Sequence, residues 1–133
     1  MHYSNFEKTM KYSKSQINKA GKQLNQVLDE KELDDAILVI NDWRTLHLVP
    51  LTYLENQLKE ILQENRIVSY LMSSRLKRLE SIQKKIKNTP DMQLARVHDI
   101  GGIRIVLHDI KAVERLKDIL KNTAFKGFKR KII

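Results

Sequence analysis

Four residues between Arg75 and Lys85 combine cationic side chains with a hydroxyl group at a regular spacing. They are Arg75, Lys77, Ser81 and Lys85. Side chains two apart on a strand share a face, so Arg75 and Lys77 would converge at a strand end. Ser81 and Lys85 are four apart and would share one face of a following helix. Because helix amino ends, Arg and Lys all bind phosphate groups, the spacing suits a corner built around a phosphate chain. An ordinary basic surface with a serine helix cap is the simpler alternative.

A second group of functional residues lies in the segment HDIGGIRIVLHD, which contains Asp99, the pair Gly101-Gly102 and Arg104. Mg²⁺ in phosphate sites takes one or two carboxylates together with phosphate oxygens. Asp99 beside a phosphate corner is therefore a candidate Mg²⁺ ligand. In the alternative interpretation, Asp99 caps a turn, the glycines form a bulge and Arg104 is a solvated partner for a carboxylate.

Other kinds of chemistry find no support in the sequence. The four histidines, His2, His47, His98 and His108, lack the spacing of zinc ligands, and there is no cysteine. No serine lies in a nucleophile elbow, so no catalytic residue is identified. Trp43, Arg44 and His47 are interpreted as packing residues. Without an export signal, a membrane-spanning apolar run or cysteine, the expected location is the cytoplasm.

Positive charge is concentrated in the second half of the chain. Residues 1–66 contain 9 Lys/Arg and 10 Asp/Glu, whereas residues 67–133 contain 16 and 6, a net charge of +10. Such a half would attract RNA, DNA, acidic lipid or the phosphates of a nucleotide. The basic tail is interpreted as a solvated terminus; its cations are Lys126, Lys129, Arg130 and Lys131.

Apolar residues at helical spacing predict three helices in residues 1–66. The first is expected over residues 14–28. The second runs through AILVINDWRTLHL and stops before Pro50, because proline disfavours helical geometry at Val49. The third is expected over residues 51–65.

The pattern changes in residues 67–133, where a strand is predicted near 67–77. A helix follows through Leu79 and Ile86 and ends around residues 88–90. A second strand alternates Ile103, Ile105 and Leu107 on one face with Arg104, Val106 and His108 on the other. A last helix begins after Asp109, a predicted cap. The predicted class is α/β (α+β), with a helical region over 1–66 and a βαβα core over 67–133 that together form one folding unit. Two strands are few for an independent sheet.

The pattern Arg75-x-Lys77-x-x-x-Ser81-Ile82-x-x-Lys85, followed by LARVHDIGGIRIVL, resembles the RelA/SpoT nucleotidyltransferase domain, the family of guanosine tetraphosphate (ppGpp) synthetases. NDWRTLHLVPLTYLENQL is also similar to the helical lead-in of standalone members. The resemblance covers roughly residues 33–121.

The resemblance implies transfer of the β,γ-pyrophosphate of ATP to the 3′-hydroxyl of GTP or GDP, with Mg²⁺ as cofactor. It assigns the ATP phosphates to Arg75, Lys77, Ser81 and Lys85, with Arg104 supporting the nucleotide side of the site. Asp99 would hold Mg²⁺. Cations in these positions would neutralise charge that moves during transfer.

The acceptor residues of the family have no counterpart in this sequence. A Gly-Tyr-Arg-type segment and a later Glu-x-Gln strand are expected, but the sequence after Asn122 reads TAFKGFKRKII, without Tyr or Glu. The sequence therefore predicts an incomplete domain, the ATP-donor half of a standalone member, which would not transfer pyrophosphate alone. The alternative is a non-catalytic basic RNA-binding or regulatory interaction module. Few aromatic residues interleave with its cations, which weakens a stacking surface for single strands.

Overall fold

The computed structural model describes residues 10–123. Three helices come first, α2 (Lys14–Gln23), α3 (Glu30–Leu46) and α4 (Leu48–Glu64). They are followed by β1 (Leu71–Leu76), α5 (Leu79–Asn88), the short 3₁₀ helix η1 (Leu94–Arg96), β2 (Gly101–Val106) and α6 (Ile110–Lys121). The predicted mixed α/β class and the order ααα then βαβα are confirmed.

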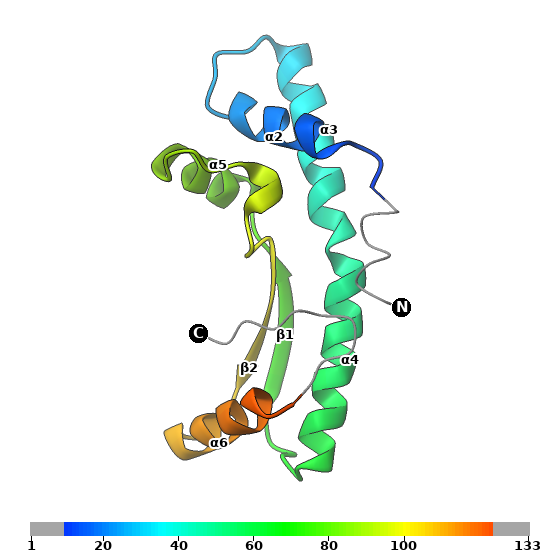
Figure 1. The fold of residues 1–133 in the computed structure, drawn as a ribbon, viewed down its shortest axis with the longest axis vertical. Helices are drawn as coiled ribbons and strands as arrows, with labels where there is room; N and C mark the ends of the chain where they lie inside the picture. The colour runs from blue at the N-terminus through cyan, green and yellow to red at the C-terminus, as the bar shows by residue number, and fades with distance from the viewer. Residues whose placement is uncertain (1–9, 124–133) are drawn as a thin grey trace.

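Helices α3 and α4 lie nearly end to end and form the long side of the molecule (Figure 1). Only His47 separates them, and its Nδ1 lies 2.8 Å from the carbonyl oxygen of Trp43. The prediction that the second helix stops before Pro50 is confirmed, since α3 ends at Leu46. The predicted start of the third helix at residue 51 is wrong, because α4 already begins at Leu48. Pro50 occupies the first turn of α4, where a helix needs no N–H from it.

Helix α2 ends five residues earlier than the predicted residue 28. The reason is a pair of hydrogen bonds to α5, in which the Gln83 side chain donates to the Leu24 carbonyl and the Asn25 side chain donates to the Gln83 carbonyl. The first bond uses the Leu24 carbonyl, a backbone group that a longer α2 would need, and the second holds the Asn25 side chain against α5. Val27, predicted on the apolar stripe, is fully exposed.

Strand β1 begins at Leu71 and not near residue 67, because the end of α4 uses the intervening backbone. Arg66 adopts a positive φ of 58° and donates its N–H to the Gln63 carbonyl, while Ile67 donates to the Leu62 carbonyl. This pair of bonds is the Schellman motif, a common helix ending.

The sheet of the described residues consists of β1 and β2, paired antiparallel with Leu71 opposite Val106 and Leu76 opposite Gly101. A Cβ on Gly101 would touch the Leu51 side chain of α4, so the face that includes Gly101, Ile103 and Ile105 lies against α4. Figure 1 shows α4 along this side, with α5 and α6 near opposite ends of the sheet. The predicted alternation along the second strand is confirmed, since Ile103 and Ile105 are half-buried whereas Arg104 and Val106 are exposed.

One apolar core joins the first helices to the segments around the sheet. Its fully buried side chains include Ile17 of α2, Ile40 of α3, Ile82 of α5, Leu94 of η1 and Ile100. Residues from both predicted regions therefore pack in one cluster. Asp109 accepts a hydrogen bond from the Ala112 N–H at 2.8 Å, which confirms the predicted cap of α6.

Each helix in residues 10–123 is too short or too polar to span a bilayer. The basic tail predicted as a solvated terminus lies outside the described residues.

Packing around Gly21 predicts a specific loss of stability. A Cβ at Gly21 would lie 2.8 Å from the Leu94 Cβ and 3.0 Å from the Ile86 Cδ1, whereas a Cβ at Gly102 would meet nothing within 4 Å. Overpacking costs about 1–3 kcal/mol, of which alanine in a helix recovers about 1 kcal/mol. We therefore expect Gly21→Ala to lower the free energy of unfolding in urea titrations by up to about 2 kcal/mol, and by more than Gly102→Ala does. Gly102→Ala is the matched control, and equal values for both variants would contradict the prediction.

Candidate functional site

The strand-to-helix corner between β1 and α5 is held by two backbone hydrogen bonds of Lys77. The Lys77 N–H donates to the Ile100 carbonyl at 2.6 Å, which extends the pairing of the two strands by one residue. The Lys77 carbonyl accepts a hydrogen bond from Arg44 Nε of α3 at 2.8 Å. Only Lys77 and Arg78 connect β1 to α5, so the corner is tight and both polar groups of the Lys77 backbone are used.

Two lysine side chains meet on one carboxylate at this corner. Lys77 Nζ lies 2.9 Å from Asp99 Oδ2, and Lys85 Nζ lies 3.0 Å from Asp99 Oδ1. The side chains are 18%, 33% and 51% exposed for Lys77, Lys85 and Asp99, respectively, so the cluster remains open to a ligand. The structure thus brings Lys77, Lys85 and Asp99 together from the end of a strand, a helix and the loop before β2.

The charge of Asp99 is stabilised by its two partners. Partial burial raises the pKa of its carboxyl, but hydrogen bonds and positive charge from Lys77 and Lys85 outweigh this effect. The pKa of Asp99 falls from 3.8 to about 2. Asp99 is therefore a carboxylate at neutral pH, which is the form that binds a metal ion.

Arg75 and Arg104 lie on the face of the sheet opposite to α4. Arg75 pairs with Gly102, and Arg104 pairs with Ser73 two positions along β1. Because side chains two apart share a face, Arg75 lies on the same side as Lys77, as the spacing predicted, and Arg104 lies on this side too. Both arginines are exposed. Gly102 adds no side chain opposite Arg75, so this face offers cations with free space around them.

Ser81 is the third residue of α5 and is exposed, one turn before Lys85. The helix begins after Arg78, whose side chain makes no capping hydrogen bond. The first N–H groups of α5 therefore receive no side-chain cap and can bind an anion. Glu80, in the same turn, is the one nearby acidic residue of α5 that opposes such binding.

Arg44 is the residue at this corner that the sequence pattern did not reveal. It was interpreted as a packing residue beside Trp43, but its guanidinium donates to the Lys77 carbonyl and, from Nη1, to Asn41 Oδ1 at 2.9 Å. The spacing of Asn41 and Arg44 is consistent with a contact on one helix face. The contact with Lys77 bridges 33 positions of sequence, and no local pattern predicts it.

Asp99 is the one predicted metal ligand at the corner. Within residues 10–123, no three His, Asp or Glu side chains cluster closely enough to hold a metal ion. Mg²⁺ in nucleotide sites takes one or two carboxylates and completes its shell with phosphate oxygens and water. A single exposed, ionised carboxylate therefore fits a Mg²⁺ ion that binds together with a polyphosphate.

Comparison with known proteins places these residues in a described family region. Residues 74–131 match the family described as "Region found in RelA / SpoT proteins", and this range includes every predicted site residue. A protein of Mycoplasma genitalium named "Probable guanosine-3′,5′-bis(diphosphate) 3′-pyrophosphohydrolase" is 31% identical over 81 residues. The match covers 61% of this chain and 11% of that relative, so the chain spans only a small part of the relative's length.

The low pKa of Asp99 predicts how the ion cluster responds to acid. The unfolded chain has an aspartate pKa of about 3.9, and the folded value is lower, about 2. The cluster therefore stabilises the fold above about pH 4, and this contribution is lost as the pH falls toward 2. A ¹³C NMR titration of the Asp99 carboxyl should give a midpoint near 2 that rises in Lys85→Ala.

Lys84→Ala is the matched control for this titration, because Lys84 is the exposed neighbour of Lys85 on the same helix. It removes the same charge without breaking the contact with Asp99 and should leave the midpoint unchanged. A wild-type midpoint near 4 would contradict the ion cluster.

Proposed function

Because residues 74–131 match the region found in RelA/SpoT proteins, we propose that the chain binds ATP with Mg²⁺ at the corner between β1 and α5 and takes part in guanosine tetraphosphate (ppGpp) metabolism. The observation that carries the proposal is the convergence of Lys77 and Lys85 on Asp99. Cations from a strand end and a helix, beside a carboxylate, are the groups that a metal-bound polyphosphate requires.

In the proposed complex, phosphate oxygens replace the Asp99 carboxylate as partners of Lys77 and Lys85. Arg75 and Arg104 on the open face of the sheet add two further cations, and Ser81 adds a hydroxyl at the start of α5. Asp99, released from the lysines, would hold Mg²⁺. Mg²⁺ when bound supplies charge neutralisation on the phosphate chain. The residues of the chain orient the phosphates and stabilise the charge that moves during transfer.

The proposed reaction class is transfer of pyrophosphate from ATP to the 3′-hydroxyl of GTP or GDP. The name of the Mycoplasma relative refers to guanosine-3′,5′-bis(diphosphate), the product of that transfer to GDP, which supports the same metabolism. The proposal for this chain is the ATP-donor half of the reaction, because the residues assigned to the ATP phosphates, from Arg75 to Arg104, lie within the matched residues 74–131.

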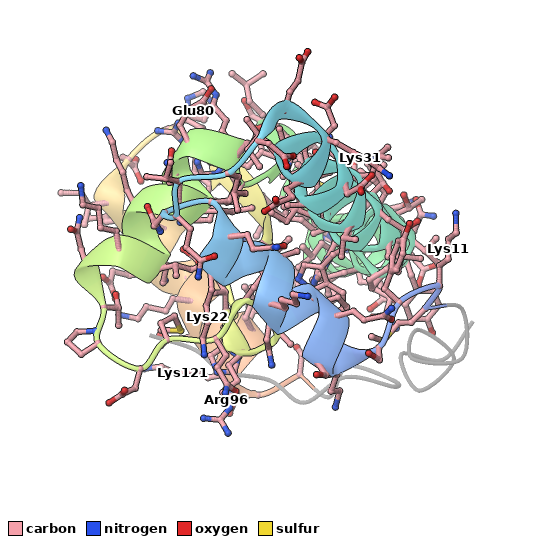
Figure 2. All side chains as sticks on the ribbon, turned by 90° about the horizontal axis from the view of Figure 1, so that it is seen from above. Lys11, Lys22, Lys31, Glu80, Arg96 and Lys121 are labelled. Atoms are coloured by element: carbon pink, nitrogen blue, oxygen red, sulfur yellow. The ribbon has the colours of Figure 1, made fainter. Side chains whose placement is uncertain are left out.

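A second candidate function is binding of the RNA backbone, favoured by a hollow away from the corner. Lys22, Lys87 and Arg96 line this hollow between α2, α5 and η1. Figure 2 shows Lys22 and Arg96 on the same side of the molecule. RNA binding there would weaken steeply with salt, because each phosphate contact releases counterions. It would depend on Arg96 and not on Asp99.

Calorimetric titration with ATP and Mg²⁺ tests the proposed site. We expect saturable binding by wild type and a dissociation constant raised about 10- to 100-fold in Lys85→Ala, as for loss of a hydrogen bond to a charged group. Arg75→Ala should weaken binding as well. Lys84→Ala, with the same charge change on the same helix, should bind like wild type.

Equal losses in Lys84→Ala and Lys85→Ala would indicate unspecific attraction to the basic surface and would count against the proposed site. Absence of nucleotide binding by the folded wild type, together with tight RNA binding that requires Arg96, would favour the second candidate.

Metal dependence gives a separate prediction for Asp99. Replacing its carboxylate with an amide removes the negative charge that repels metal-free ATP, so Asp99→Asn should bind ATP in the presence of EDTA more tightly than wild type does. The same variant should lose most of the gain in affinity that Mg²⁺ confers on wild type. Parallel titrations with and without Mg²⁺ measure both effects, and an unchanged Mg²⁺ dependence in Asp99→Asn would exclude Asp99 as the metal ligand.

A further inference from the structure

Arg44 connects the helical first half of the chain to the corner. We infer that Arg44 is a positioning residue, which fixes the Lys77 backbone so that the Lys77 side chain is held beside Asp99. The importance of Arg44 for nucleotide binding rests on the proposed function. The effect of Arg44 on the position of the Lys77 backbone does not.

The Lys77 carbonyl needs a partner that neither neighbouring element supplies. Strand β1 ends at Leu76, and the first intrahelical bond of α5 runs from the Ile82 N–H to the Arg78 carbonyl. The Lys77 carbonyl lies between these two hydrogen-bonding systems. Arg44 Nε supplies the donor at 2.8 Å in a partly buried position, where a charged donor is worth more than in water.

The Arg44 side chain is itself held in place. Asn41, one turn earlier on α3, accepts a hydrogen bond from Arg44 Nη1 at 2.9 Å. The neighbouring α3 residues Ile40 and Trp43 are buried in the apolar core. Because α3 is anchored in the core and the guanidinium is oriented from both sides, Arg44 fixes a defined position for the Lys77 carbonyl.

Lys77, which Arg44 holds, is connected to both the cationic and the anionic side of the ion cluster. Lys77 carries one ammonium group of the cluster, and its N–H binds the carbonyl of Ile100, the residue after Asp99. Ile100 is fully buried. A shift of the Lys77 backbone would therefore change the distance between Lys77 Nζ and the Asp99 carboxylate. None of the contacts of Arg44 requires that it touch a ligand.

A matched control exists at the other end of the molecule. Arg115 of α6 donates from Nη2 to the Asn65 carbonyl at 2.8 Å, so it also joins an arginine to a backbone carbonyl of a distant segment. It is far in sequence from the corner and contacts none of its residues among the hydrogen bonds described. Arg115→Met thus removes an arginine-to-carbonyl bond, here an exposed one, and an equal charge without touching Lys77.

The experiment compares Arg44→Met with Arg115→Met in the full chain by two readouts. Amide hydrogen exchange at Lys77, measured by NMR, should be about tenfold faster in Arg44→Met and unchanged in Arg115→Met. The dissociation constant for ATP with Mg²⁺ should rise about tenfold in Arg44→Met alone. A purely structural role would instead give similar changes in both variants, in proportion to their loss of thermal stability.

Asn41→Ala provides a milder variant in case Arg44→Met does not fold. It keeps the guanidinium but removes the acceptor that orients it, and it should accelerate exchange at Lys77 to a smaller extent. Wild-type exchange at Lys77 in either Arg44→Met or Asn41→Ala would overturn the inference. Faster exchange at Lys77 in a chain whose wild type binds no ATP would support the inference and count against the proposed function alone.

Discussion

Apolar packing beneath the corner brings together like charges that would otherwise repel each other. Ile82 and Ile100 are fully buried. Ile82 lies three residues before Lys85 in α5, and Ile100 directly follows Asp99. Exposed ion pairs contribute only about 0–1 kcal/mol each, so contacts with Asp99 cannot hold two lysines in place alone. Burial of one isoleucine contributes about 1.5–3 kcal/mol. The core therefore fixes α5 and the start of β2, and the charged side chains take positions that the core imposes.

Local sequence patterns predicted the elements of this fold well, because most elements are defined by contacts between near neighbours. Alternation along β2 and the cap at Asp109 depend on spacings of two and three residues, and both are present. The errors lie where distant or terminal interactions decide. Gln83 binds the Leu24 carbonyl from 59 positions away and ends α2 early. Pro50 is tolerated because it lies in the first turn of α4, where no N–H from it is needed. The prediction considered only the effect of proline on the preceding residue, Val49.

The candidate site divides in the same way. The strand end and the following helix were visible in the spacing of Arg75, Lys77 and Lys85, since these residues belong to two consecutive elements. The two ion pairs of Asp99 were not visible, because they connect residues 22 and 14 positions apart through the fold. Arg44 was also missed, as its acceptor is a backbone carbonyl, a group that every residue carries and that no sequence pattern distinguishes.

The shared carboxylate affects which anion the corner suits. A simple phosphate that approaches Lys77 and Lys85 also approaches Asp99. The pKa of the Asp99 carboxyl is about 2, so this group is negatively charged at neutral pH and repels the phosphate. A polyphosphate that carries Mg²⁺ presents oxygens to the lysines and a cation to the carboxylate, so each charged group faces an opposite charge. We therefore propose two effects of Asp99. Without a ligand, its charge offsets the repulsion between the two ammonium groups that the core positions; in the proposed complex, it discriminates against anions that bring no metal.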